Sequence, residues 1–264
     1  MIGQTQVSQT RQALGSDFEF RVNCAGLSWE RAERALDRVH VELRKLDREL
    51  NEEIPESPFF RLSRASPNEA VPLGPHAVAL LEQTQELVRV WPALKKLLHG
   101  YRFHPQDRVA FRVQEEAQIS LTAIARGYGL DLTCSILDQE GIQNFFLTAN
   151  RKNVLLRGSA PDGNPWDLTW DWRDPSKGAA NGCPLAYRLG DPIAISAHWN
   201  DQCSALVGTK KGSQAEMLAL QLGEVGWNAQ WAEQRDIAIA LKMRSEAQPR
   251  WNGHFQALFD VLKK

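Results

Sequence analysis

The chain has 264 residues, of which 43% are hydrophobic and 24% are charged, and its formal net charge is −1. This composition is typical of a soluble globular protein, and the near-zero net charge gives no electrostatic reason to expect a nucleic acid or an anionic membrane as a partner. No apolar run reaches the roughly 20 residues that a membrane-spanning helix needs, and residues 1–15 lack the apolar segment of a signal peptide.

The cysteines indicate the same class of protein. Cys24, Cys134, Cys183 and Cys203 show no C-x-x-C spacing and have no paired histidines nearby. This pattern favours buried free thiols over a zinc site. We therefore expect a cytoplasmic protein, built either as one domain over residues 1–264 or as two intimate halves of about 1–118 and 119–264.

The first part of the chain predicts a strand and two long helices. Residues 13–22 alternate apolar and polar after a Leu-Gly-Ser turn at residues 14–16, as a half-buried strand does. Ser28 is a suitable N-cap for a helix with one buried face, because apolar residues follow it at spacings of three and four. These residues are Trp29, Ala32, Leu36, Val39, Leu43, Leu46 and Leu50. A second amphipathic helix is predicted over residues 75–98, which Pro92 must kink or end.

The most informative segment is residues 119–131, which read ISLTAIARGYGLD. Its pattern predicts a short extended run, a loop of small residues, and an amphipathic helix that begins at Leu130. Glycines and small residues let a ligand approach the backbone closely, and free amides at a helix start beside a cation suit phosphate. The residues that carry this expectation are Ala123, Ala125, Arg126, Gly127, Tyr128 and Gly129. An ordinary strand–turn–helix fits the same pattern, and the spacing is not the G-x-G-x-x-G of a Rossmann site.

Further along, residues 145–158 hold two apolar runs around the polar turn at residues 150–153, which predicts a hairpin. Trp166, Leu168, Trp170 and Trp172 share one face of a following strand, either as core or as a platform for ligand stacking. Strands are expected near residues 193–196, 204–208 and 236–242, and a helix over residues 213–223. Residues 208–213 are one residue short of a P-loop and predict a turn.

Several of these segments resemble one family in order along the chain. Residues 119–131 are similar to the I-D-L-G-G-I-A-K-G-Y-A-V-D motif of the FAD:protein FMN transferase family, the ApbE-like proteins, and residues 161–166 to its P-D-G-x-P-W run. Leu14, Gly15 and Ser16 correspond to a Met-Gly-Thr motif, and residues 193–196 resemble the strand that precedes a flavin-contacting loop. The resemblance implies an α+β fold of ApbE-like (T-fold-like) architecture, with antiparallel sheets packed with helices.

The resemblance also implies a ligand and its binding residues. An ApbE-like protein binds FAD with magnesium on the diphosphate and passes FMN to a threonine of a target protein. The cofactor-binding residues are then Gly15, Ser16, Ala123, Arg126, Gly127, Tyr128 and Ser196. Residues 119–131 are expected to line the main cleft. The implied metal ligands are Glu216, where the family has Asp, and the backbone carbonyl of Ala123.

Other family elements are changed. Leu220 stands where the family has a metal-binding threonine, and magnesium tolerates such losses poorly. Arg151 and Lys152 replace a diglycine at the hairpin turn, which fits either an altered ligand pose or a solvated basic turn. His198 and Asp201 are the remnants of a longer His-Asp-Pro loop.

Two functions from different classes remain. The chain is either a divergent ApbE-like protein that binds a flavin, another nucleotide or a protein partner without catalysis, or an active magnesium-dependent flavinyltransferase. The metal residues favour the first, and the Arg-Gly-Tyr at residues 126–128 favours the second. A hydrolase finds no support, because G-x-S-x-G and H-E-x-x-H are both absent from the sequence.

Overall fold

A computed structural model gives the fold. It describes residues 5–90, 95, 98–114, 122–150, 152–170, 183–187, 193–199, 203–209, 211, 213–215, 218–219, 238–243, 250–251 and 259–261. The helices are α1 (Trp29–Leu50), α2 (Pro58–Arg64), α3 (Pro75–Val90) and α4 (Thr122–Gln139). The strands of the first half are β1 (Gln6–Ala13), β2 (Ser16–Asn23), β3 (Ala70–Pro72), β4 (Tyr101–His104) and β5 (Val109–Arg112). The strands of the second half are β6 (Phe145–Ala149), β7 (Asn153–Arg157), β8 (Asp167–Trp170), β9 (Cys183–Tyr187), β10 (Ile193–Trp199), β11 (Cys203–Thr209), β12 (Ala238–Met243), β13 (Arg250–Trp251) and β14 (Phe259–Val261).

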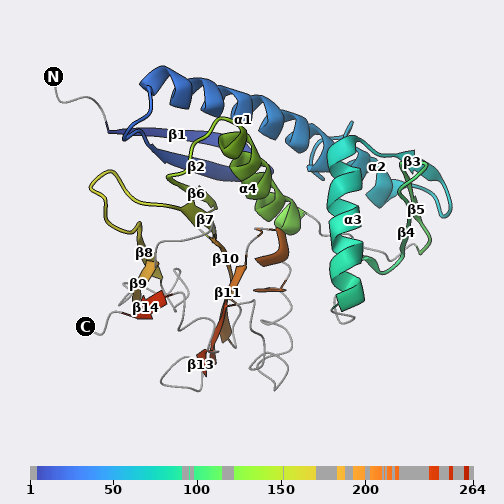
Figure 1. The fold of residues 1–264 in the computed structure, drawn as a ribbon. Coiled ribbons are helices and arrows are strands. Elements are labelled where there is room, and N and C mark those ends of the chain that lie inside the picture. The colour runs from blue at the N-terminus through green and yellow to red at the C-terminus, as the bar shows by residue number, and fades with distance from the viewer. Residues whose placement is uncertain are drawn as a thin grey trace.

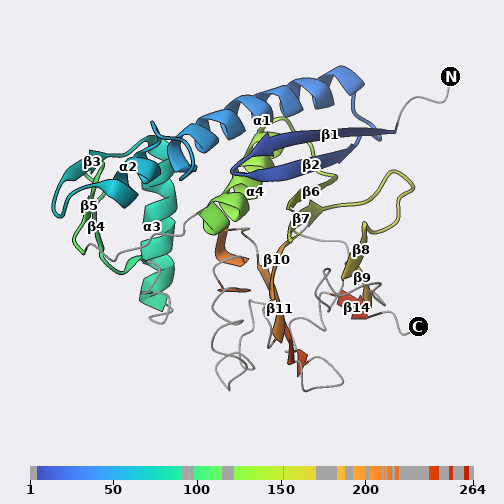
Figure 2. The same cartoon turned by 180° about the vertical axis from the view of Figure 1, so that it is seen from behind.

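The main sheet has eight strands in the order β1-β2-β6-β7-β10-β11-β12-β13, and smaller sheets have the orders β14-β9-β8 and β3-β5-β4. Every strand pair within the described residues is antiparallel. Helices α1 and α4 pack against the main sheet on one side (Figures 1 and 2). The predicted α+β fold of antiparallel sheets packed with helices is confirmed. The proposed halves stay a prediction, although strands from both contribute to the main sheet.

Helix α1 agrees closely with its sequence pattern. The Ser28 side chain accepts a hydrogen bond from the amide of Arg31, which caps the helix as predicted. The buried residues follow the expected spacing of three and four, with Ala35 added to the set and Trp29 only partly buried. This stripe packs onto the main sheet and onto α4.

Helix α4 corrects the expectation for residues 119–131. Its helical conformation begins at Thr122, so Ala123, Arg126 and Gly129 lie in the helix and do not form a loop before it. A Cβ atom on Gly129 would lie 3.0 Å from a ring atom of Phe18 and 3.3 Å from a methyl group of Leu43. This glycine therefore allows close packing between α4, α1 and β2, which outweighs its low helix propensity. Residues 115–121 lie outside the described part of the chain.

A second layer stands beside the main sheet. It consists of α2, α3 and the β3-β5-β4 sheet, which lie together at one end of α1 (Figure 1). The Ser57 side chain caps the start of α2 by accepting a hydrogen bond from the amide of Phe60. Helix α3 is described over Pro75–Val90, within the predicted range of residues 75–98, and Pro92 lies outside the described residues.

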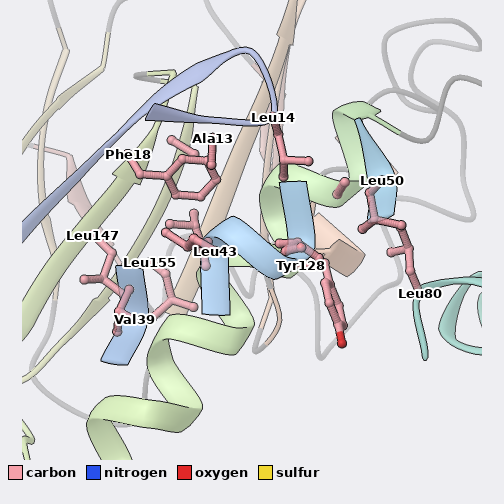
Figure 3. Close-up of a cluster of buried hydrophobic side chains, with 14 of the residues drawn as sticks. Ala13, Leu14, Phe18, Val39, Leu43, Leu50, Leu80, Tyr128, Leu147 and Leu155 are labelled. Atoms are coloured by element: carbon pink, nitrogen blue, oxygen red, sulfur yellow. The ribbon is translucent and has the colours of Figure 1, made fainter. Parts of the chain in front are cut away.

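The hydrophobic core lies between the main sheet and its helices. Figure 3 shows Phe18 and Leu147 of the sheet facing Val39 and Leu43 of α1. Phe18, Val39 and Leu147 are each 0% exposed. Burial of such side chains supplies about 1.5–3 kcal/mol each, so this interface fixes the position of the sheet relative to α1 and α4.

The hairpin over residues 145–158 is confirmed as β6 and β7, which pair from Phe145–Arg157 to Ala149–Asn153. On the other face of the sheet, the Trp166 ring lies 5.9 Å from that of Phe146, and Trp166 and Leu168 are buried. This part of the tryptophan stripe is core; the side chain of Trp170 and all of Trp172 lie outside the described structure. Among the described residues, no helix is long and apolar enough to cross a membrane.

Candidate functional site

The first candidate residues lie in the β1–β2 turn. Leu14 and Gly15 form a two-residue connection with positive φ angles of 53° and 63°, and Ala13 pairs with Ser16 across it. This is the turn type that best matches the twist of a hairpin, and Gly15 adopts it without steric cost. The amide of Leu14 donates to Asp47 of α1 at 2.6 Å. Gly15 thus shapes the turn that the sequence predicts at residues 14–16.

Arg126 reaches the strand that follows this turn. Its Nη1 atom donates to the hydroxyl of Ser16 at 3.4 Å, and Ser16 is only 6% exposed. Arg126 lies in the first two turns of α4, on the side that faces β2. Two of the sequence-predicted site residues, from opposite halves of the chain, are therefore brought into contact.

A second polar pair lies on the same face of the main sheet. The strand register aligns Phe18, Ala149, Asn153 and Ser196 in one row across β2, β6, β7 and β10. Residues paired in this way project from one face, and Ser16 projects from the same face two residues before Phe18. The hydroxyl of Ser196 donates to Oδ1 of Asn153 at 2.5 Å, and both side chains are buried. The sequence analysis predicted Ser196 but missed Asn153 as its partner.

Tyr128 points away from these two pairs. Its hydroxyl lies 3.5 Å from Nδ1 of His76 at the start of α3, and its ring packs among Leu50 and Leu80 (Figure 3). Burial raises the pKa of Tyr128, and the Glu49 and Asp131 carboxylates raise it further. The phenol therefore stays protonated near neutral pH, and it joins α4 to α3.

Asp131, the last residue of the motif, holds another element. Its Oδ2 atom accepts hydrogen bonds from the amide of Ser213 at 3.0 Å and from the Ser213 hydroxyl at 2.8 Å. Ser213 begins a helical stretch, so the carboxylate caps a helix from outside. The sequence analysis did not assign Asp131 a role; its acidic side chain at the end of the motif was the available signal.

The implied metal ligands are described only in part. Glu216 and Leu220 lie outside the described residues, as do Arg151 and Asp201, and nothing is described of the side chains of Ala123 and His198. The Ala123 carbonyl belongs to α4, and helical carbonyls point along the axis toward the amide four residues later. Within the described parts of the chain, no group of three or more His, Cys, Asp or Glu residues could hold a metal ion. Both metal assignments stay predictions.

Other reactive groups lie apart from the polar pairs. Burial, with the Asp138 carboxylate nearby, raises the pKa of the Cys134 thiol to about 12, so this thiol is not a nucleophile near neutral pH. A surface groove of about 440 Å³ lies on the outer side of α1. It is lined by Arg34, Asp37, Arg38, Val41, Glu42 and Glu140. The expectation that the motif lines the main cleft stays a prediction.

Comparison with known proteins identifies what the sequence and the fold of this chain resemble. Residues 92–182, which include α4 and the β6–β7 hairpin, match the ApbE family. This part of the chain is similar to the ApbE family. No curated protein matches it in a sequence search.

Solved structures with an ApbE fold match nearly the whole chain. The flavin transferase ApbE of Vibrio cholerae superposes with a TM-score of 0.78 at 14% identity, covering 96% of this chain and 99% of that one. The apo flavinyl transferase ApbE of Pseudomonas stutzeri gives 0.76 at 18% identity, covering 98% and 99%. The ApbE protein of Thermotoga maritima gives 0.65 at 15% identity, covering 96% and 99%. The ApbE-like fold predicted from the sequence motifs is confirmed.

Proposed function

We propose that this chain is a divergent ApbE-like protein that binds FAD or a related nucleotide and does not transfer FMN to a protein threonine. The observation that carries this proposal is the contact between Arg126 and Ser16, made on one face of the main sheet from two distant parts of the chain. A guanidinium and a hydroxyl at this position form a pair of donors suited to phosphate oxygens.

The position of Arg126 also suits an anion electrostatically. It lies near the N-terminal end of α4, where the helix dipole adds positive potential. An arginine presents a planar fork of donors, where the family's lysine presents a point charge. The nucleotide diphosphate would therefore be held by charge and hydrogen bonds from this chain's own residues.

The groups available for the metal do not fit magnesium well. Magnesium requires near-octahedral oxygen ligands, and the sequence offers Leu220 in place of a threonine and Glu216 in place of a shorter carboxylate. Because Ala123 is helical, its carbonyl is directed into α4. We therefore expect nucleotide binding without transfer.

The test is spectroscopic and calorimetric. We expect purified protein to bind added FAD with a change in the flavin absorption spectrum, and Arg126→Ala to weaken binding by about 1.5–3 kcal/mol in titration calorimetry, as loss of a charge-assisted hydrogen bond does. Arg126→Lys keeps the charge and is the matched control, with a smaller loss. An unchanged dissociation constant in Arg126→Ala would remove this residue from the site.

The alternative is an active flavinyltransferase, which the similarity to flavin transferase structures over most of the chain favours. Its partner would be a protein that carries an acceptor threonine. Incubation with FAD, magnesium and a threonine-bearing target peptide separates the two functions by mass spectrometry. A flavinylated peptide that depends on magnesium and is lost in Glu216→Ala would overturn our proposal; no covalent product, with FAD binding retained, supports it.

A further inference from the structure

Within the described part of the chain, the first strand of the main sheet has an outer edge with no strand paired to it. β1 is the terminal strand of the sheet, and β2 is its only pairing strand among the described residues. Because a two-residue turn joins them, Ala13, Arg11 and Gln9 make the inward hydrogen bonds. The amides and carbonyls of the alternate residues, Ser8, Thr10 and Gln12, point outward.

This edge lacks the features that usually prevent strands from pairing. β1 is eight residues long, contains no proline or lysine, and pairs with β2 without a bulge. The only charged side chain in β1 is that of Arg11, which donates to the Thr10 carbonyl at 2.9 Å and to the Gln9 side chain at 2.9 Å. The outward carbonyl of Thr10 is thus satisfied by a side chain that an incoming strand can displace.

Helix α1 presents a charged flank beside the middle of this edge. Glu33, Asp37, His40 and Arg44 follow one another at spacings of four and three, which places them along one side of the helix. His40 lies close enough to β1 for Arg11 to affect it: burial lowers the pKa of His40, and Arg44 and Arg11 lower it further. The flank is acidic in its N-terminal half and basic in its C-terminal half.

We propose that two copies of this chain form a two-fold symmetric dimer through antiparallel pairing of their β1 edges, with the axis at Thr10. This register places Thr10 opposite Thr10, Ser8 opposite Gln12 and Gln9 opposite Arg11. The hydrogen bond between Arg11 and Gln9 that exists within one chain can then form across the interface. No like charges face each other directly along the paired strands.

The charges on α1 select a second copy as the occupant. An axis at Thr10 also passes near the middle of α1 around His40, because α1 packs along β1 and its Asp47 binds the amide of Leu14 at the end of that strand. The two α1 flanks then run antiparallel, and Asp37 in the acidic half faces Arg44 in the basic half of the other copy. An extended segment of a different protein could pair with the backbone edge. The change from acidic to basic along α1, however, is complementary to a second copy of the same helix running in the opposite direction.

Sedimentation velocity across a range of protein concentrations tests the strand pairing. The wild-type chain should sediment as a dimer, and Thr10→Pro should sediment as a monomer, because proline removes an outward-pointing donor and leaves the β1–β2 hydrogen bonds intact. Thr10→Val keeps the backbone donor and should remain a dimer. A wild-type chain that is monomeric at every concentration, or a folded Thr10→Pro variant that still forms dimers, would exclude the interface.

Charge reversal gives an independent test that does not depend on a proline. Arg44→Glu places acidic groups against acidic groups across the axis and should raise the dimer dissociation constant several-fold, more strongly at low salt. Adding Asp37→Arg in the same chain restores opposite charges across the axis and should recover the dimer. An equal dissociation constant in all three proteins would contradict the role of the α1 flank.

Discussion

At the scale of single residues, the glycines of the central motif are explained by packing as well as by ligand approach. Gly129 lies against Phe18 and Leu43 with no room for a further methyl group. Gly15 occupies the left-handed position of a hairpin turn. Sequence reasoning assigned both to ligand approach, because a glycine required by a neighbouring side chain looks the same in sequence as one required by a ligand.

Gly129→Ala should therefore destabilise the protein. Alanine favours a helix by about 1 kcal/mol over glycine, but overpacking a buried site costs about 1–3 kcal/mol. Phe18 is fully buried and cannot move aside easily. We expect Gly129→Ala to lower the midpoint of urea unfolding with an unchanged slope. The control Ser135→Ala, on the exposed side of the same helix, should raise the midpoint slightly. If Gly129→Ala instead raised the free energy of unfolding by about 1 kcal/mol, helix propensity would outweigh the overpacking.

At the scale of elements, local sequence patterns predicted the helices and hairpins that depend on residues close together in the chain. The spacing of apolar residues gave α1, and the polar turn between two apolar runs gave the β6–β7 hairpin, since both depend on neighbours in sequence. The predicted start of α4 at Leu130 was wrong, since the helix begins at Thr122. Two glycines lower the helix propensity of this segment, and tertiary packing nevertheless keeps it helical. The contact of Asn153 with Ser196 could not be predicted from local patterns, since it depends on strand register between distant segments.

The cap made by Asp131 leads to a prediction about the element that it holds. Asp131→Ala removes the acceptor for the amide and hydroxyl of Ser213 and should reduce stability by about 1–2 kcal/mol, as loss of a helix cap does. Asp131→Asn keeps an oxygen acceptor and should lose less. Thermal unfolding of the wild type, Asp131→Asn and Asp131→Ala measures the order of their stabilities. Equal unfolding midpoints would mean that the cap does not stabilise the folded state.

At the scale of the whole molecule, the C-terminal end of α1 joins the two layers. Asp47 accepts the amide of Leu14 in the main sheet's first turn, while Glu49 accepts the amides of His76 and Ala77 at the start of α3 at 2.9 and 3.1 Å. These carboxylates bind backbone groups far away in sequence, which no periodic pattern reveals. The family resemblance predicted the fold, and the structure adds how its layers are held together.

Glu49→Ala should loosen the second layer without unfolding the main sheet. The substitution leaves two amides at the N-terminus of α3 without their acceptor, which costs about 1–3 kcal/mol if they are not rehydrated. Local opening of this layer then becomes more frequent, so amides of α3 and of β3–β5 should exchange with deuterium faster while those of β2, β6 and β7 keep their rates. Glu49→Gln retains one oxygen acceptor and should give an intermediate effect. Faster exchange spread evenly over both layers would instead mean that Glu49 stabilises the molecule as one cooperative unit.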